Sequence, residues 1–427
     1  MAGTPRDLAG WLAWQQQLHP RSIDLGLERV RRVAQRLGLL PAAGRNAIVA
    51  GTNGKGSTTA FMAAICRAHG LRTGRYSSPH LVQYAERIAL GDAGGERLAS
   101  EAELVAAFGR IEAARGADSL TYFEFGTLAA LLLFRDAGCQ ASVLEVGLGG
   151  RLDATNLVDA DVAVLCSVGM DHADWLGNTL ALIGREKAGV FRAGQQVVLG
   201  SDDLPGSVHE RLAELRVSPA VAGRDFRWRV RPDGSWQFDD GAFTIEALPA
   251  PSLAGSIQYR NAATAIAAAR RLLRPRPLSA QAVAAALRSV DLPGRLQFVQ
   301  GPVQWVLDVA HNEPAAQVLA RELEARPVQG RTIGVLGMLA DKDVAAVVQA
   351  LAGSVDGWIL CGIDEPRGLD TAALRARLPG ATTVLAEARD VAGACALASQ
   401  RSTPGDRVLV CGSFHTVGPA LQWLRLY

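Results

Sequence analysis

The chain has 427 residues, of which 49% are hydrophobic and 20% are charged, a composition typical of soluble globular proteins. This length predicts two or three domains, because a single hydrophobic core rarely grows so large. The formal net charge is only +2, from 44 basic and 42 acidic residues, so charge alone predicts neither a nucleic-acid partner nor a membrane partner.

The cysteines and the N-terminal sequence indicate a cytoplasmic protein. The cysteines are scattered, mostly inside apolar segments, and no two form a CxxC pair, so they predict reduced core residues rather than a disulfide framework or a zinc site. The opening sequence "MAGTPRDLAGWLAWQQQ" carries an aspartate and glutamines where a secretory signal has its apolar region. We expect no membrane span, since no uninterrupted apolar stretch is long enough.

The predicted elements, taken in chain order, describe an α/β fold. Residues 6–39 are expected to be helical with a break near Pro20, and a buried strand at 46–51 precedes a glycine turn and a helix over 57–70. Helices then alternate with nearly continuous apolar strands, at residues 141–150, 161–172 and 195–201. This alternation predicts a mostly parallel sheet covered by helices on both faces.

The remaining sequence predicts a second domain. Residues 224–248 alternate apolar and polar side chains around a Pro-Asp-Gly turn, which is typical of an antiparallel hairpin at the sheet edge. Helices over 260–274 and 279–290 and a hinge over 292–300 follow, and then a new alternation begins, with strands at residues 303–310, 331–339, 357–363, 382–388 and 406–414. We therefore expect a P-loop-type, mostly parallel sheet domain over residues 1–292 and a smaller Rossmann-like α/β domain over residues 293–427.

The segment "VAGTNGKGST", residues 49–58, predicts a phosphate loop of unusual spacing. In the common pattern G-x-x-x-x-G-K-[ST], a glycine would stand at Val49 and a hydroxyl at Gly56, whereas here the hydroxyl comes one position later, at Ser57. The strand–turn–helix context still favours polyphosphate binding, because backbone N–H groups, the helix N-terminus and Lys55 all attract anions. The alternative is a tight glycine turn with a solvated lysine.

Polar residues also follow other predicted strands, where ligands of open parallel sheets collect. Glu145 lies among apolar neighbours, so it needs a cation such as nucleotide-bound magnesium, or else an ion pair with Arg151. Asp171 and His172 are expected to end the next strand, as ligands or as structural residues. In the second domain, Asp308 with His311 and the segments 337–343 and 412–418 close strands in the same way.

Two further segments leave alternatives open on local pattern alone. Ser77 and Ser78 follow a short strand and can cap a helix or offer hydroxyls to a metal. Arg185, Glu186 and Lys187 stand together in "GREKAGV", for which composition favours a solvated charged turn.

Over nearly its whole length the chain resembles the folylpolyglutamate synthase/dihydrofolate synthase family, relatives of the Mur ligases. The motifs that carry the resemblance stand in the order "GTNGKGS", "YSSPHL", "YFEFGTLAALLLF", "LEVGLGGRLDATN", "DHADWLG", "REKAGVF", "NAATA", "LPGRLQ", "DVAHN", "GMLADKD" and "GSFHTV". The resemblance implies an ATP-binding domain of the Mur ligase central type followed by a glutamate ligase domain. It also explains the unusual loop, since the family uses the variant T-N-G-K-G-[ST].

The resemblance implies roles for individual residues. It implies one or two magnesium ions, whose ligands in the family correspond to Ser78, Glu145 and His172. The catalytic residues that it implies are Lys55, His172 and Lys187. Lys187 matches a lysine that is carbamylated in the family, which reverses the solvated-turn interpretation. The residues implied to bind ATP are Thr52, Asn53, Gly54, Lys55, Gly56, Ser57, Asn261, Arg295 and Asp308.

Two stretches resemble the bifunctional bacterial form, which binds dihydropteroate as well as folates. The implied substrate contacts are Ile23, Asp24, Leu25, Thr121, Tyr122, Phe123, Glu124, Leu152, Asp153 and Ala154. Aromatic and carboxylate side chains suit a flat pterin with N–H donors, although Tyr122 and Phe123 are alternatively core residues. The sequence departs from the family at Ile257, where many members carry histidine before a retained Gln258 and Asn261.

The activity implied is the ATP-dependent ligation of L-glutamate to dihydropteroate and to the γ-carboxylate of tetrahydrofolates, through an acyl phosphate. His311 and His415 are expected to orient glutamate or nucleotide. The partners implied are these small molecules, with no nucleic acid or membrane, and the chain is expected to be a monomer. Three alternatives remain: a monofunctional folylpolyglutamate synthase, a P-loop NTPase that drives a partner, and a cell-wall ligase, which would need a UDP-sugar site.

Overall fold

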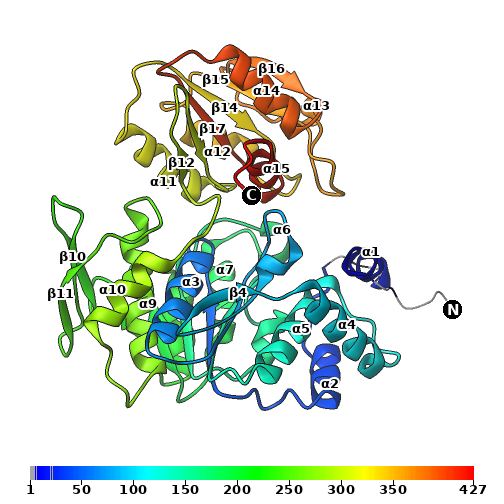
Figure 1. The fold of residues 1–427 in the computed structure, drawn as a ribbon, viewed down its shortest axis with the longest axis vertical. Helices are drawn as coiled ribbons and strands as arrows, with labels where there is room; N and C mark the ends of the chain where they lie inside the picture. The colour runs from blue at the N-terminus through cyan, green and yellow to red at the C-terminus, as the bar shows by residue number, and fades with distance from the viewer. Residues whose placement is uncertain (1–4, 6, 20, 22) are drawn as a thin grey trace.

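The structure is a computed structural model that describes residue 5, residues 7–19, residue 21 and residues 23–427. It contains two α/β domains, the C-terminal one stacked on the N-terminal one (Figure 1). The predicted fold class is therefore confirmed, with a large, mostly parallel sheet followed by a second, smaller sheet. Among the described residues, no helix combines the length and hydropathy needed to cross a bilayer.

The first sheet has eight strands in the order β4-β3-β2-β5-β1-β6-β7-β8. Only β3 and β4 run antiparallel to their neighbours, so the carboxyl ends of β1, β5 and β6 lie together at one edge. The strands are β1 (Arg45–Ala50), β2 (Thr73–Tyr76), β3 (Ile88–Asp92), β4 (Gly95–Leu98), β5 (Ala141–Glu145), β6 (Val162–Leu165), β7 (Gln196–Leu199) and β8 (Ala220–Val221).

Helices cover both faces of this sheet, as the nearly continuous apolar strands predicted. Side chains alternate along β1, so that Ile48 and Ala50 pack in one core and Ala47 and Val49 in the other. The helices are α1 (Leu8–Leu18), α2 (Glu28–Arg36), α3 (Lys55–Ala68), α4 (Glu101–Arg115), α5 (Tyr122–Asp136), α6 (Ala173–Leu176), α7 (Leu180–Lys187), α8 (Gly206–Glu214), α9 (Ile257–Leu272) and α10 (Ala280–Ser289), with the 3₁₀ turns η1 (Tyr84–Arg87), η2 (Ala154–Leu157) and η3 (Ala188–Val190).

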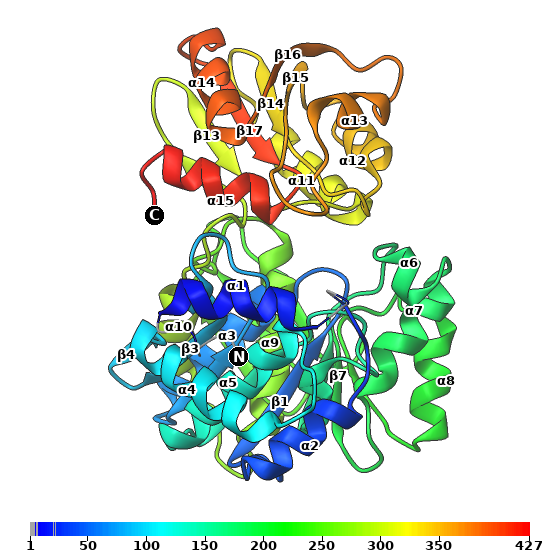
Figure 2. The ribbon, with the colours of Figure 1, turned by 90° about the vertical axis from the view of Figure 1, so that its right-hand side faces the viewer.

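The N-terminal segment forms two helices instead of one broken helix. Helix α1 packs across α4 and α5 at the surface (Figure 2), and α2 packs on α4 and α5. Between them, residues 23–26 form neither helix nor strand, while Pro20, where the break was expected, lies outside the described residues.

The predicted hairpin at residues 224–248 is not part of the large sheet. It forms a separate three-stranded antiparallel sheet of β9 (Arg227–Val230), β10 (Trp236–Asp239) and β11 (Thr244–Leu248), in the order β11-β10-β9. Trp236 and Phe238 alternate inward from β10 and pack in the same core as α3, α9 and α10. Edge pairing with the large sheet was therefore wrong, because these side chains attach the small sheet to the helices.

The C-terminal sheet has six strands in the order β12-β13-β17-β14-β15-β16, and only β12 is antiparallel. Its strands are β12 (Gln297–Val299), β13 (Gln304–Leu307), β14 (Thr332–Leu336), β15 (Gly357–Cys361), β16 (Val384–Ala388) and β17 (Arg407–Cys411). The helices α11, α12 and α13 cover one face, and α14 and α15 cover the other. These helices are α11 (Glu313–Glu324), α12 (Val344–Ala350), α13 (Thr371–Ala376), α14 (Val391–Arg401) and α15 (Phe414–Trp423).

The cysteines are all free and buried, as their apolar sequence context predicted; they are Cys66, Cys139, Cys166, Cys361, Cys395 and Cys411. Burial among apolar side chains raises the pKa of the Cys166 thiol to about 11, so this group is a core residue and not a reactive thiolate.

Two glycines of the N-terminal domain predict opposite effects of substitution by alanine. A Cβ at Gly74 in β2 would lie 2.3 Å from the ring of Phe134, so Gly74→Ala should lower the unfolding free energy by about 1–3 kcal/mol. Gly109, inside α4, has open space, so Gly109→Ala should raise it by about 0.5–1 kcal/mol. Urea unfolding of both variants tests this, and equal effects would contradict it.

Candidate functional site

The site is a cleft of about 640 Å³ at the junction of the two domains. Its walls come from the carboxyl ends of β1 and β5, from the segment after β6, and from C-terminal segments that follow β13, β14 and β17. A cavity of this size, with a few convergent charged groups, is typical of small-molecule sites.

The segment that was predicted to be a phosphate loop joins β1 to α3. Helix α3 begins at Lys55, so Gly56 and Ser57 lie in its first turn, where backbone N–H groups lack helical acceptors. Gly54 has a left-handed backbone with φ of 84°, and a Cβ there would lie 2.8 Å from Asn261 Oδ1 of α9. Only glycine meets both conditions, and Asn261 is thereby placed against the loop.

The loop is fastened to the segment that follows β6. The Thr52 hydroxyl accepts from the Gly169 amide at 3.0 Å, and the Asn53 amide donates to Ser167 Oγ at 3.0 Å. The Lys55 ammonium turns back and donates to the carbonyls of Gly51 and Thr52, at 3.0 Å and 3.1 Å. The loop therefore presents a fixed backbone and a partly buried cation to the cleft.

Glu145 is the last residue of β5 and faces this loop. It is 4% exposed, and burial raises its pKa, against the opposing effect of Lys55 and Arg295. The Ser78 amide donates to Glu145 Oε2 at 3.3 Å, which brings a hydroxyl-bearing residue beside the carboxylate. The ion pair of Glu145 with Arg151 was wrong, because Arg151 pairs with Glu186 at 2.9 Å.

Lys187 ends α7 and is buried, with 4% of its surface exposed. Its ammonium donates to the Gly51 carbonyl at 3.1 Å. Burial, with the nearby charge of Lys55, lowers the pKa of Lys187 to about 7. The solvated-turn interpretation was therefore wrong for Lys187, although it describes Arg185, which is exposed and pairs with Glu214.

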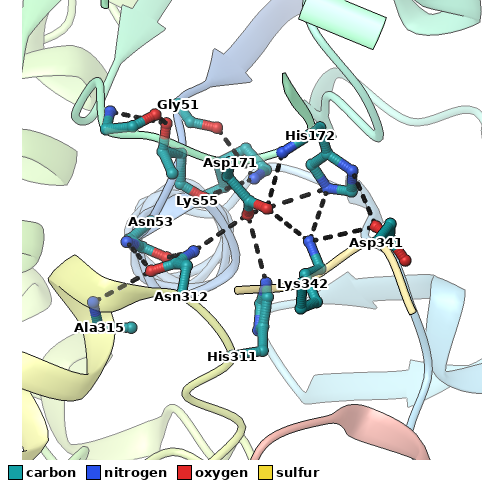
Figure 3. A network of polar contacts seen from close by, with 12 residues as sticks. Gly51, Asn53, Lys55, Asp171, His172, His311, Asn312, Ala315, Asp341 and Lys342 are labelled. Carbon is teal, nitrogen blue, oxygen red and sulfur yellow. Dashed lines mark hydrogen bonds and ion pairs between the residues drawn. The ribbon is translucent and has the colours of Figure 1, made fainter. Parts of the chain in front are cut away.

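A polar network joins the two domains at the loop (Figure 3). Asn53 and Asn312 exchange side-chain hydrogen bonds at 3.0 Å and 3.1 Å, and Asn312 also donates to Asp171 at 3.0 Å. Asp171 further accepts from the Lys342 ammonium at 2.5 Å and lies 3.5 Å from His311 Nε2. Although burial opposes it, these cationic groups hold the pKa of Asp171 well below its usual value.

His172 belongs to this network, with its Nε2 3.3 Å from the Lys342 ammonium (Figure 3). The expectation that it ends a strand was wrong. Strand β6 ends at Leu165, and His172 precedes α6 with a left-handed backbone. Its Nδ1 is buried and has no hydrogen-bond partner in the part of the chain that the structure describes. This atom lies 3.6 Å from Asp341 Oδ2, and burial lowers the pKa of His172 to about 4. Within the described residues, no group of three or more His, Cys, Asp or Glu side chains is arranged to hold a metal ion.

Arg295 and Asp308 bring the segment between the domains to the cleft. Asp308 accepts from the amides of Leu296 and Ala310, at 2.7 Å and 2.8 Å. The Arg295 guanidinium lies 4.8 Å from the ring centroid of Phe414, and its buried Nη1 has no hydrogen-bond partner among the described residues. Burial lowers the pKa of Arg295. The guanidinium lines the cleft, where its unpartnered Nη1 can donate to a ligand.

The residues assigned to a pterin substrate form the far wall of the cleft, with one exception. Asp153 accepts from the amides of Gly147 and Leu148, at 3.0 Å and 2.9 Å. Tyr122 does not line the cleft and instead packs edge-on against Tyr84. The residues that do line it are Ile23, Asp24, Leu25, Thr121, Phe123, Glu124, Leu152, Asp153 and Ala154.

His311 and His415 both line the cleft, but in different surroundings. His311 faces Asp171, whereas His415 lies 3.4 Å from Glu365, and burial lowers the His415 pKa. The sequence pattern left Asp171 as a ligand or a structural residue, and it assigned no role to Asn312 or Lys342. Their segments were recognised as strand ends, but only the packing of the two domains brings the three side chains together.

Comparison with known proteins identifies related chains. The Mur ligase middle domain family matches residues 49–269, and the glutamate ligase domain family of Mur ligases matches residues 294–414. A curated "Dihydrofolate synthase/folylpolyglutamate synthase" of Escherichia coli (strain K12) is 44% identical over 417 residues, which cover 97% of this chain and 95% of that protein.

Two solved structures are similar along the whole chain. The E. coli FolC protein in complex with DHPP and ADP has a TM-score of 0.91 at 41% identity, covering 100% of this chain and 99% of that one. A bifunctional folylpolyglutamate synthase/dihydrofolate synthase with Mn, AMPPNP and L-glutamate bound has a TM-score of 0.89 at 43% identity, covering 99% of this chain and 100% of that one.

The buried Lys187 predicts a pH-dependent stability. In the unfolded chain its pKa returns to 10.5, so between this value and about 7 the unfolded state binds more protons than the folded state. The unfolding free energy should therefore rise with pH across this window, and Lys187→Met should lose that rise. Urea unfolding of both proteins between pH 7 and about pH 10, in buffer freed of carbon dioxide so that the amine stays unmodified, tests it, and parallel pH dependences would contradict it.

Proposed function

The chain belongs to the dihydrofolate synthase/folylpolyglutamate synthase family of Mur ligases, and we propose that it ligates L-glutamate to dihydropteroate and to the γ-carboxylate of tetrahydrofolates, at the expense of ATP. It is an ATP-dependent amide-forming ligase. The observation that carries the proposal is the contact of Asn53, in the phosphate loop, with Asn312, and of Asp171, beside the loop, with Asn312 and Lys342. It places a nucleotide-type loop and a second domain's polar groups around one cleft.

The nucleotide is held by the phosphate loop and by the segment between the domains. The backbone N–H groups of Gly54 to Ser57 and the Lys55 ammonium bind the phosphates, as helix N-termini do. Asn261, Arg295 and Asp308 line the same cleft and contact the rest of the nucleotide. Thr52 and Asn53 hold the loop in position through their hydrogen bonds to the segment that follows β6.

The enzyme uses a divalent metal ion with ATP, and the residues present fit magnesium. The buried Glu145 carboxylate and the Ser78 hydroxyl offer the hard oxygen ligands that Mg²⁺ prefers, with phosphate and water completing the shell. The unpartnered Nδ1 of His172 is available for a second ion. When bound, magnesium neutralises charge on the transferring phosphoryl group.

The reaction needs positioning and charge balance more than a nucleophilic side chain. A substrate carboxylate oxygen attacks the γ-phosphorus of ATP, ADP leaves, and an acyl phosphate forms. The neutral amine of L-glutamate then attacks the acyl carbon, and the amide forms as phosphate leaves. Lys55 and Lys342 face the developing negative charge from opposite domains, while the closed junction excludes water.

We propose a domain boundary between residues 292 and 293, which is supported by the absence of helix and strand between α10 and β12 in this described segment. We propose that the enzyme acts as a monomer, since the described residues that line the cleft come from both domains of a single chain. A cytoplasmic location agrees with six free thiols, which an oxidising compartment would tend to pair.

Measuring ADP release tests the function directly. With ATP and magnesium, ADP should form over many turnovers with dihydropteroate or tetrahydrofolate only when L-glutamate is present, since without it the reaction stops at one acyl phosphate per site. Continued ADP release without L-glutamate would favour an NTPase that drives a partner. If, with L-glutamate present, ADP forms with tetrahydrofolate but not with dihydropteroate, the enzyme is a monofunctional folylpolyglutamate synthase.

Glu145 and Lys55 should be essential for turnover. We expect Glu145→Gln and Lys55→Ala each to lower kcat/KM by about 10²-fold or more, because both act on charge at the phosphoryl group. The control is Glu186→Gln, which removes an ion pair with the exposed Arg151 and should keep activity. Near-normal turnover in both site variants, with folding confirmed by circular dichroism, would contradict the assignment.

Lys187 is proposed to be carbamylated. Only a neutral amine attacks carbon dioxide, and a pKa of about 7 leaves Lys187 largely neutral at slightly alkaline pH. Activity should fall when carbon dioxide is removed and return with bicarbonate. A Lys187→Ala enzyme should regain activity with short carboxylic acids such as acetate. Full activity of Lys187→Ala without any acid would refute the proposal.

A further inference from the structure

Arg29 of α2 joins two walls of the cleft without lining the cleft itself. Its Nε donates to both carboxylate oxygens of Glu124, at 2.9 Å and 3.0 Å. The rest of its guanidinium donates to the Asp24 carboxylate and to the Asp24 backbone carbonyl. The side chain is 18% exposed, so water competes little for these bonds.

Glu124 is a fixed anchor for this arginine. Its side chain is 4% exposed, and it accepts from the Thr121 amide at 2.7 Å and from the Thr121 hydroxyl at 2.9 Å. These bonds cap the N-terminus of α5, which belongs to the domain core. A carboxylate buried this deeply needs a cationic partner, and Arg29 supplies it.

Asp24, by contrast, lies in residues 23–26, which form neither helix nor strand. Its other charged neighbours bind it loosely, since His19 lies at 3.4 Å and the largely exposed Arg21 at 3.6 Å. Arg29 donates hydrogen bonds to both the side chain and the backbone of Asp24, so it is the main contact that fixes this loop to the core. Both the loop and the start of α5 line the cleft.

We propose that Arg29 is a positioning residue that sets the affinity for the pterin end of the substrate, by holding Asp24 in its binding conformation through Glu124. This inference rests on the proposed function, which assigns the wall to a pterin. Arg29 binds Asp24 Oδ2, whereas Oδ1 has only a longer contact, 3.6 Å from the exposed Arg21, among the described residues, so Oδ1 can accept from N–H donors of the substrate. Without Arg29, the loop must be ordered on binding, which costs affinity and leaves the distant phosphoryl site unchanged.

The test compares steady-state kinetics of Arg29→Ala and of Arg32→Ala. Arg32 lies on the same helix and pairs with Asp118, away from the cleft, so it is a matched control. We expect Arg29→Ala to raise the KM for dihydropteroate about tenfold or more, while kcat and the KM for ATP and L-glutamate change less than about twofold. Arg32→Ala should change none of them.

Two further variants separate positioning from general damage. Arg29→Lys keeps the charge but cannot span Glu124 and Asp24 together, so it should fold and show an intermediate KM. The double variant Arg29→Ala with Asp24→Asn should raise the KM for dihydropteroate by less than the product of the two single effects. The reason is that each substitution disrupts the same contact between Arg29 and Asp24. If Arg29→Ala fails to fold, Arg29→Lys carries the comparison.

Three outcomes are distinguishable. An unchanged KM for dihydropteroate in folded Arg29 variants overturns the inference. An equal rise in the KM for ATP overturns it as well, because it indicates general damage. A wild-type enzyme that does not use dihydropteroate at all rejects the proposed function instead, before the variants are compared.

Discussion

The carbonyl of Gly51 is the point on which the site depends. Two ammonium groups, that of the partly buried Lys55 and that of the buried Lys187, donate to this single oxygen at 3.0 Å and 3.1 Å. Like charges so close together, out of water, are costly unless anions balance them or one group loses its proton. Glu145 supplies part of the balance, and the low pKa of Lys187 supplies another part. A site arranged in this way favours phosphate and any reaction that turns Lys187 into an anion.

The same charge requirement explains how the two domains meet. Asp171 belongs to the N-terminal domain, yet its partners Asn312 and Lys342 come from the C-terminal domain. Contact between the domains removes water from these groups, and the hydrogen bonds and ion pair drawn in Figure 3 replace the lost hydration, so the network offsets the cost of bringing the domains together. An enzyme that forms a water-sensitive acyl phosphate needs such closure.

Sequence reasoning succeeded where local chemistry carries the information. The spacing around Lys55 requires a strand, a left-handed glycine and a helix start, and all three are present. It failed where burial decides. Lys187 and Arg185 stand two positions apart in one charged turn, but one is buried beside Gly51 and the other faces solvent. Tyr122 lies next to Phe123, yet only Phe123 reaches the cleft, because neighbouring residues on a helix point in different directions.

By itself, the sequence determined the alternation of helices and strands, the phosphate loop and the family, since these depend on periodicity and on short motifs. Only the tertiary structure decided which charges are buried together. Asn53 and Asn312 are separated by more than half the chain, and Arg29 of α2 bonds to Glu124 of α5, which lies 95 residues later in the sequence. Such pairs leave no local pattern, because their energy comes from desolvation and contact, which exist only after the chain has packed.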